Sequence, residues 1–293
     1  MLTPLYRLLR YAPGTMPIDT LASHAPAALS ATQHVLAVVS GLAVGFSLGL
    51  IGGGGSILAV PLLLYLVGYP NPHVVIGTTA LAVSMNAYIN LIPHARAGNV
   101  RWKQALWFAV VGAMSAYVGS SLGKAVDGKK LLFLFALLML VIAGLMLRRR
   151  DGAGNPQAGA QPHSESLPRL IAAAVVVGLL AGFFGIGGGF LIVPGLVFST
   201  GMPMIAAIGS SLVSVGTFGL TTAINYTRSG LLDFTVALLY IGGGVAGGWL
   251  GTRMATHLGK QGKGTLNLIF ALLVAAVALY MLWRNLSAFG LHL

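Results

Sequence analysis

The sequence contains no cysteine and only five acidic residues. Without cysteine the chain forms no disulfide bond and no thiolate metal site. Charged residues make up 8% of its 293 positions, whereas about 25% is usual in soluble domains. So little charge leaves a water-exposed surface uncovered, so a soluble globular fold is excluded. The 56% of hydrophobic residues excludes an intrinsically disordered chain as well.

Long apolar runs fill most of the chain. A helix needs about 20 apolar residues to cross a bilayer, and eight runs have about this length or more. Because they are continuously apolar, they predict helices rather than the alternating strands of a membrane barrel. The predicted fold class is therefore an all-α polytopic membrane protein. The eight runs are roughly His34–Val67, Val74–Pro93, Gln104–Gly123, Leu131–Leu147, Leu170–Ser199, Ile205–Tyr226, Phe234–Thr256 and Leu266–Trp283.

Basic residues are in excess, with 17 lysines and arginines and a formal charge of +12. They lie in short loops between the apolar runs, which is typical of membrane anchoring, so we predict contact with a lipid bilayer and no binding of nucleic acid. If all eight runs cross once, both termini share a face. That face then holds 11 of the 17 basic residues, Arg96 and Arg228 among them. The positive-inside rule places it in the cytoplasm of a bacterial inner-membrane protein.

The chain is predicted to contain two homologous membrane repeats of four segments each. Residues 34–147 and 169–285 form the repeats, a polar linker at 148–168 joins them, and the tails are 1–33 and 286–293. GLIGGGGSILAVP, which begins at Gly49, matches GFFGIGGGFLIVP at seven of thirteen positions with an offset of 133. IGTT then aligns with IGSS at an offset of 132. Such duplication is typical of transporters whose site lies between the repeats.

The paired glycine motifs, each running into a proline, and the IGTT and IGSS that follow them resemble the TauE/SafE family of sulfite and organosulfonate exporters. The resemblance covers about residues 35–283 and implies a carrier of small sulfur-containing anions. Sulfite, sulfoacetate, related sulfonates and thiosulfate all remain open as substrates. Import of the same anions is an alternative, and a non-transport membrane scaffold or assembly protein is another.

The glycine motifs predict a break in the first segment of each repeat. The run His34–Val67 would make a helix of about 50 Å, longer than the roughly 30 Å hydrocarbon core, and each glycine costs about 1 kcal/mol in a helix. The half-helices that follow would begin near Ser56 and Phe190 and direct free N–H groups at an anion. The alternative is close helix packing, which we predict for Gly242–Gly244 and Gly247–Gly248. If the broken segments are re-entrant, the repeats are inverted; if they cross, the repeats are parallel.

Neutral hydrogen-bond donors complete the predicted substrate site between the repeats. Hydroxyl and amide groups hold an anion without the cost of a buried charge, although Ser and Thr hydroxyls also bond back to their own helix. Arg96 and Arg228 are either interfacial anchors or an entrance that attracts anions. The predicted substrate-binding residues are Gly52, Gly53, Gly54, Gly55, Ser56, Thr78, Thr79, Asn86, Gly187, Gly188, Gly189, Ser210 and Ser211.

Several absences restrict the mechanism. No Asp or Glu lies well inside an apolar run, since Asp233 stands at the edge of its segment; proton-coupled carriers usually need such a carboxylate. No Walker motif, no GxSxG and no HExxH are present, so we predict no enzyme activity. We expect no metal and no cofactor. A small anion and the bilayer are the expected partners, and homo-oligomer assembly is left open.

Overall fold

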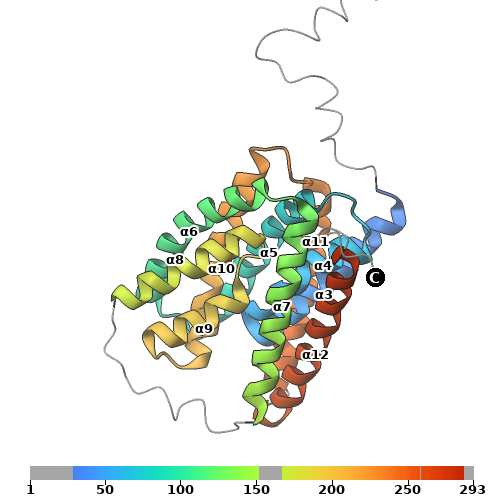
Figure 1. The fold of residues 1–293 in the computed structure, drawn as a ribbon. Coiled ribbons are helices and arrows are strands. Elements are labelled where there is room, and N and C mark those ends of the chain that lie inside the picture. The colour runs from blue at the N-terminus through green and yellow to red at the C-terminus, as the bar shows by residue number, and fades with distance from the viewer. Residues whose placement is uncertain (1–28, 152–166, 258, 287–293) are drawn as a thin grey trace, which may run out of the picture.

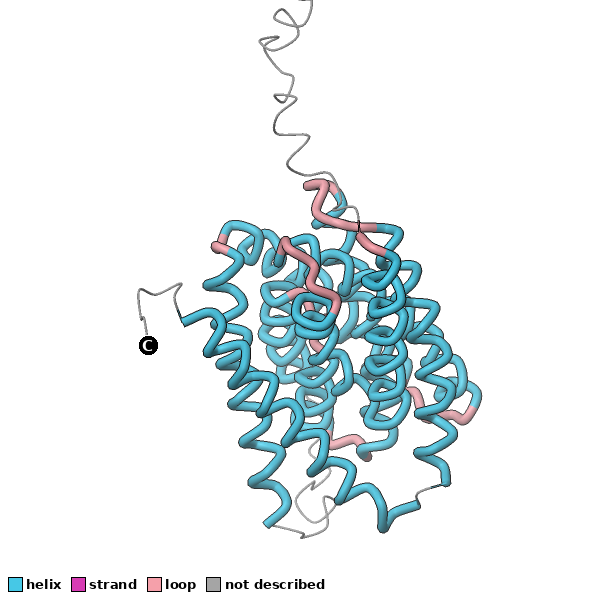
Figure 2. The backbone as a smooth tube through the Cα atoms, turned by 90° about the vertical axis from the view of Figure 1, so that its right-hand side faces the viewer, coloured by secondary structure: helices cyan, strands magenta, loops and turns pink. Residues whose placement is uncertain are grey.

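The computed structural model describes residues 29–151, 167–257 and 259–286, and its regular elements within these ranges are all helices (Figures 1 and 2). Eight of them are long and apolar enough to cross a membrane, which confirms the all-α polytopic class. The bounds are α3 (Ala31–Ile51), the 3₁₀ helix η1 (Gly52–Leu58), α4 (Ala59–Pro61), the π-helix η2 (Leu62–Leu66), α5 (Pro72–Arg96), α6 (Trp102–Ala125), α7 (Gly128–Asp151), α8 (Leu167–Phe184), α9 (Gly189–Thr200), α10 (Met204–Thr227), α11 (Phe234–His257) and α12 (Gly259–Asn285). Most of the predicted tails and linker, at 1–28, 152–166 and 287–293, lies outside the described residues.

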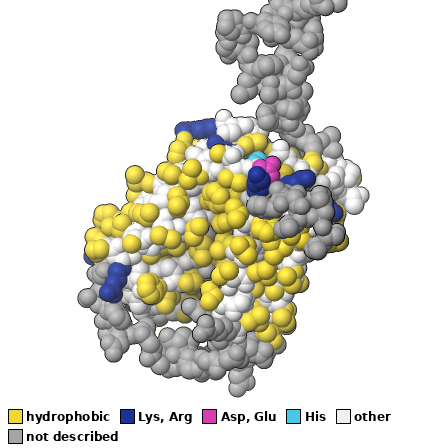
Figure 3. Space-filling view, in the orientation of Figure 1, with side chains coloured by type: hydrophobic (Ala, Val, Ile, Leu, Met, Phe, Trp, Pro, Cys, Tyr) yellow, Lys and Arg dark blue, Asp and Glu magenta, His cyan; other side chains and the backbone are white. Residues whose placement is uncertain are grey.

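The outer surface is that of a protein surrounded by lipid. Figure 3 shows apolar side chains over most of the visible bundle, with lysine and arginine gathered toward its two ends. Large apolar side chains point outward on several helices, such as Phe198, Met114 and Leu238, which are 86%, 71% and 69% exposed. A water-soluble protein rarely exposes so continuous an apolar surface, so this surface contacts the bilayer.

The first glycine motif turns the chain back along α3. α3 ends where the four glycines begin, and Gly55 then lies against Ser47 of α3. At the far end of the returning segment, Gln33 Nε2 at the start of α3 donates a 3.0 Å hydrogen bond to the carbonyl oxygen of Val67. The predicted break is confirmed, and the run His34–Val67 is a helical hairpin rather than one crossing.

The second glycine motif forms the corresponding hairpin between α8 and α9. Gly188 lies against Ala181, and Gly195, further along α9, lies against Val177, which is earlier in α8. α9 therefore runs antiparallel to α8. The run Leu170–Ser199 is therefore also a hairpin. The prediction of eight crossings assumed that each glycine-containing segment crosses the membrane once, but both segments return to the side from which they start.

α3 packs in backbone contact against α11 from the other half of the chain. A Cβ atom added to Gly41 would meet Tyr240, and one added to Gly49 would meet the backbone of Gly248. The residue numbers rise together along both helices, so the two helices run parallel. Only glycine at these positions permits so close an approach.

α8 packs in the same manner against α6. A Cβ added to Gly178 would meet the Gly112 carbonyl oxygen, just as one added to Gly45 would meet that of Gly244. The two pairs are equivalent by the offsets of the repeat. Gly178 is 133 residues after Gly45, and Gly112 is 132 residues before Gly244. The first long helix of each half therefore packs against a helix of the other half: α3 against α11, and α8 against α6.

α5 and α10 cross at the centre of the bundle and run antiparallel. Gly77 near the start of α5 lies against Tyr226 near the end of α10. At mid-length, Ser84 Oγ donates a 2.6 Å hydrogen bond to the carbonyl oxygen of Gly216. α7 and α12 pack against each other at the outer edge, where Figure 1 shows them side by side.

Arg96 and Arg228 lie at opposite ends of the bundle. Arg96 ends α5, and the loop after it reaches the start of α10, where the Arg101 backbone N–H donates a 2.9 Å hydrogen bond to Ser210 Oγ. Arg228 follows the other end of α10. The prediction that both arginines share a face is wrong, because each glycine segment folds back instead of crossing. We name the two ends the Arg96 face and the Arg228 face.

Candidate functional site

The two glycine motifs meet near the crossing of α5 and α10. η1 and α9 contact each other. A Cβ added to Gly187 would lie 3.3 Å from Val215 of α10 and 3.4 Å from Val83 of α5. Gly185 lies against Ile76 of α5. The motifs of both halves are therefore brought together at the centre, where the sequence placed the substrate.

The two motifs differ in local structure. In the second motif Gly187 and Gly188 adopt left-handed backbone angles, with φ of 63° and 65°, and Gly188 is the residue before α9. α9 begins at Gly189, close to the predicted start at Phe190. In the first motif the glycines form a 3₁₀ helix instead. The predicted half-helix start near Ser56 is wrong, since the α-helical turn begins only at Ala59.

Thr78 and Ser210 link the halves through backbone groups. Thr78 Oγ1 accepts a 3.0 Å hydrogen bond from the Asp233 N–H, and Ser210 Oγ accepts one of 2.9 Å from the Arg101 N–H. Both hydroxyls are fully buried. They satisfy backbone donors that precede α11 and α6, so they have a role in stability that the sequence did not indicate.

Thr79 and Ser211 bond back to their own helices. Thr79 Oγ1 donates to the carbonyl oxygens of Val75 and Ile76, and Ser211 Oγ donates to that of Ile208. This is the alternative that the sequence analysis left open. Their oxygens can still accept hydrogen bonds, but their protons are already used.

We expect Thr78→Val to destabilise the protein by about 1–2 kcal/mol, because it leaves the buried Asp233 N–H without an acceptor, and Ser210→Val by about 1 kcal/mol, because the Arg101 N–H is only partly buried. The matched controls are Thr79→Val and Ser211→Val, which remove only a bond within one helix and should cost less than about 0.5 kcal/mol. Thermal unfolding in detergent measures all four. Equal losses in both pairs would contradict the linking role.

Asn86 is a buried amide side chain near the crossing of α5 and α10. It is 1% exposed, and neither its Nδ2 nor its Oδ1 has a hydrogen-bond partner among the described residues. It lies against Gly244 of α11, where any side chain would collide with it. An unpaired buried amide is costly, so Asn86 keeps the role of a substrate-contacting candidate.

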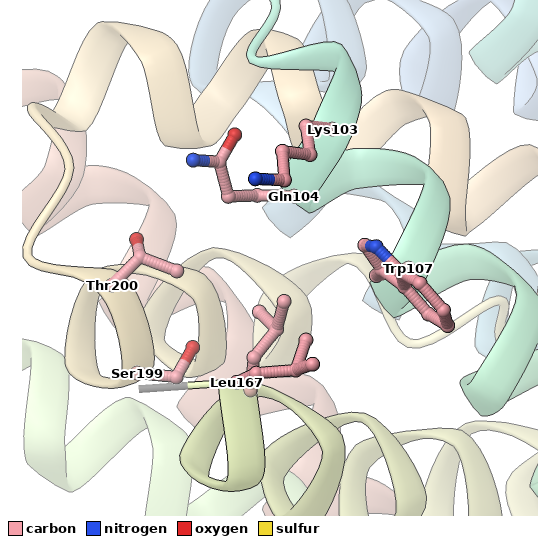
Figure 4. Close-up of a pocket in the computed structure, with 7 residues that line it drawn as sticks. Lys103, Gln104, Trp107, Leu167, Ser199 and Thr200 are labelled. Atoms are coloured by element: carbon pink, nitrogen blue, oxygen red, sulfur yellow. The ribbon is translucent and has the colours of Figure 1, made fainter. Parts of the chain in front are cut away.

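A pocket of about 120 Å³ opens between the first turns of α6 and α8 and the end of α9, at the Arg96 face. Figure 4 shows Lys103 and Gln104 on one side of it, with Ser199 and Thr200 facing them. None of the predicted substrate-binding residues lines this pocket. It is lined by Lys103, Gln104, Trp107, Leu167, Leu170, Ser199 and Thr200.

Comparison with known proteins identifies the chain's relatives. The family model described as sulfite exporter TauE/SafE matches residues 37–284. The chain belongs to this family. A probable membrane transporter protein of Xylella fastidiosa (strain 9a5c) is 53% identical over 258 residues, which cover 86% of this chain and 95% of the relative. The probable membrane transporter protein YunE of Bacillus subtilis is 28% identical over 76% of this chain and 88% of its own length. No solved structure matches.

Membership in the TauE/SafE family makes the chain a membrane transporter and not an enzyme. Its eight helices that are long and apolar enough to cross a membrane, together with its relatives, make it a multi-pass bacterial membrane protein. The predicted resemblance to the family is confirmed.

One cationic group of this TauE/SafE chain was not predicted as functional from the sequence. Lys124 Nζ donates to the backbone and side-chain oxygens of Asn225 at 3.0 and 2.8 Å and to Ser229 Oγ at 2.8 Å. The Asn225 amide in turn donates to Ser120 Oγ at 2.6 Å. These acceptors are all neutral, so Lys124 brings an uncompensated positive charge to the Arg228 face. The position of Lys124 at the end of the apolar run Gln104–Gly123 is the sequence feature that could have indicated this group.

Proposed function

We propose that the protein carries a small sulfur-containing anion, such as sulfite, sulfoacetate, another organosulfonate or thiosulfate, out of the cell. The charge that a substrate could reach carries this proposal. Lys124 is held by neutral oxygens, and Asp233 is the buried acidic residue in the described part of the chain. Asp233 is occupied at the start of α11, where it accepts hydrogen bonds from Tyr69 Oη and from the Val236 N–H. The positive charge of Lys124 at the Arg228 face therefore has no carboxylate partner among these contacts, whereas the buried Asp233 carboxylate is already hydrogen-bonded, and this favours an anion over a cation.

The halves act as inverted repeats that alternate access to a site between them. The antiparallel crossing of α5 and α10, the hairpins of both glycine motifs, and the matched exchanges of α3 and α8 support this arrangement. In inverted-repeat carriers one half rocks against the other around a site near the midplane. The place where Gly187 meets Val83 and Val215 suits such a site.

The charge count favours the Arg96 face in the cytoplasm. This reverses the sequence-based prediction of cytoplasmic termini, because the start of α3 and the end of α12 lie at the Arg228 face, where Asn285 bonds to Tyr65 and Gln33 to Val67. Ten basic residues of the helices and their ends lie at the Arg96 face and five at the Arg228 face, and the positive-inside rule assigns the richer face to the cytoplasm. The ten are Arg96, Arg101, Lys103, Arg148, Arg149, Arg150, Arg169, Arg253, Lys260 and Lys263. The five are Lys124, Lys129, Lys130, Arg228 and Arg284.

We expect electrogenic anion flux from purified protein in liposomes. Among the described residues the buried carboxylate is Asp233, whose two oxygens already accept hydrogen bonds at the start of α11. We therefore expect no side chain to carry a compensating proton, so an imposed potassium-diffusion potential should drive the anion. A potential of 100 mV supplies about 2.3 kcal/mol per negative charge, or a roughly fifty-fold concentration ratio. Sulfite, thiosulfate and sulfoacetate are the test anions, and taurine, which is zwitterionic, is the comparison. Flux that follows a pH gradient and ignores the potential would contradict this, and no flux for any anion would favour the scaffold alternative.

A further inference from the structure

Two lines of side chains run along equivalent faces of α5 and α10. Residues four apart lie on one face of a helix. The α5 file consists of Ala82, Asn86, Asn90 and His94, and the α10 file consists of Ser214, Phe218, Thr222 and Tyr226. Each member of the second file is 132 positions after a member of the first.

The files contain most of the unpaired polar groups in the interior. In the described part of the chain, eight buried side-chain nitrogen or oxygen atoms have no hydrogen-bond partner, and six belong to the files. An unpaired buried polar group costs about 1–3 kcal/mol, and lipid offers it no partner. Their concentration in two files therefore needs an explanation. The six are Asn86 Nδ2 and Oδ1, His94 Nδ1, Ser214 Oγ, Thr222 Oγ1 and Tyr226 Oη.

The α5 file leads from the crossing to the Arg96 face. Asn86 lies against Gly244 and Asn90 against Gly248, so both amides face α11. Burial then decreases along the file, since Asn90 is 8% exposed, His94 is half-buried and Arg96 beyond it is exposed. The file thus joins the centre to a basic end.

The α10 file leads from the crossing to the Arg228 face. Phe218 lies against Gly112 of α6 and separates Ser214 from Thr222. Tyr226 is fully buried, and Lys124 Nζ lies 5.7 Å from the centre of its ring. Beyond it Arg228 is exposed. This file also joins the centre to basic residues, at the opposite face.

We propose that the α5 file and the α10 file line two half-pathways for the transported anion, one opening at each face and both meeting beside Gly187. This rests on the proposed anion transport. The unpaired amide and hydroxyl groups bind water and the oxygens of an oxyanion as it passes. They are neutral, so they bind the anion without trapping it, and the arginines beyond each file attract it to the openings.

Removing single hydroxyls tests the files. Thr222→Val and Tyr226→Phe change little in volume and delete a group that has no protein partner. If these groups serve transport, flux falls at least fivefold while the melting temperature stays equal or rises. The matched controls are Thr221→Val and Tyr240→Phe, whose hydroxyls bond to the carbonyl oxygens of Thr217 and Ala59. Flux per folded molecule should be unchanged in both.

Normal flux in Thr222→Val and Tyr226→Phe would overturn the proposal. So would a loss of flux that merely follows a loss of stability.

Cysteine labelling tests from which face each file can be reached. Because the chain has no native cysteine, a single cysteine can be introduced with no other change to the sequence. Thr222→Cys should react with the anionic reagent methanethiosulfonate ethylsulfonate from the Arg228 face, and Asn90→Cys from the Arg96 face. Ile224→Cys and Ile89→Cys are the controls, since these side chains are 46% and 37% exposed on lipid-facing surface. We expect reaction at least tenfold faster than in the controls, and protection by sulfoacetate. In intact cells the charge count predicts that the reagent reaches the Arg228 face.

The labelling separates the two proposals. Flux in liposomes without reaction at Asn90→Cys or Thr222→Cys overturns the half-pathways and leaves anion transport standing. Reaction from the predicted faces without flux of any test anion supports the water-filled files and overturns the substrate class. Reaction of both variants from the same face shows a single vestibule and overturns the two half-pathways.

Discussion

Gly45→Ala and Gly178→Ala should each destabilise the protein by about 3 kcal/mol or more. The added methyl group would meet the carbonyl group of the facing glycine, Gly244 or Gly112, and backbone cannot yield as a side chain can. α3 and α11, or α8 and α6, would have to separate. We expect a large fall in melting temperature and little folded protein in the membrane.

Gly242→Ala and Gly144→Ala are the controls for this result. Nothing lies within 4 Å of a Cβ added at either position, and alanine is the better helix former by about 1 kcal/mol. Both variants should be as stable as the parent or more so. If Gly45→Ala tolerates heating as well as Gly242→Ala, the two helices are not held in backbone contact.

Gly187→Ala should reduce transport more than tenfold. Alanine at the left-handed φ of 63° costs about 1–2 kcal/mol, and its methyl group would press on Val83 and Val215, where the central helices cross. Gly54→Ala should reduce flux less, because Gly54 lies in a 3₁₀ helix and alanine fits its backbone.

Gly68→Ala is the matched control for Gly187→Ala. Gly68 has a φ of 75°, and the nearest atom to an added Cβ is Gln33 Nε2 at 3.9 Å. This variant carries the backbone strain without the central contacts. Flux and thermal stability are measured together for all three variants. If flux falls only in proportion to stability, as in Gly68→Ala, the second glycine motif is a packing device.

Local physics predicted much of the fold. Four consecutive glycines end a helix whatever surrounds them, so the break after Ile51 could be predicted. The packing role of Gly243 and Gly247 could be predicted from small-residue spacing, and both lie against α3 backbone, at Val38 and Leu42. The same prediction is wrong for Gly242, which points away from its neighbours, with nothing within 4 Å of an added Cβ.

The direction of the chain after each break could not be predicted locally. It depends on contacts such as Gln33 with Val67, which are 34 residues apart. The roles of Thr78 and Ser210 depend on backbone groups 155 and 109 residues away. A hydroxyl early in a helix looks the same in the sequence whether its partner is a substrate or a distant N–H group.

The packing of each first helix against the other half determines the order in which these helix pairs can form during synthesis. Gly45 meets Gly244 only after 199 more residues have been made, which takes about 10–40 s at ordinary rates of synthesis. Until then the glycine face of α3 lacks its partner α11, whereas α6 has already been synthesised when α8 is made. The membrane insertion machinery, or the lipid itself, must shelter that face while most of the protein is still being translated.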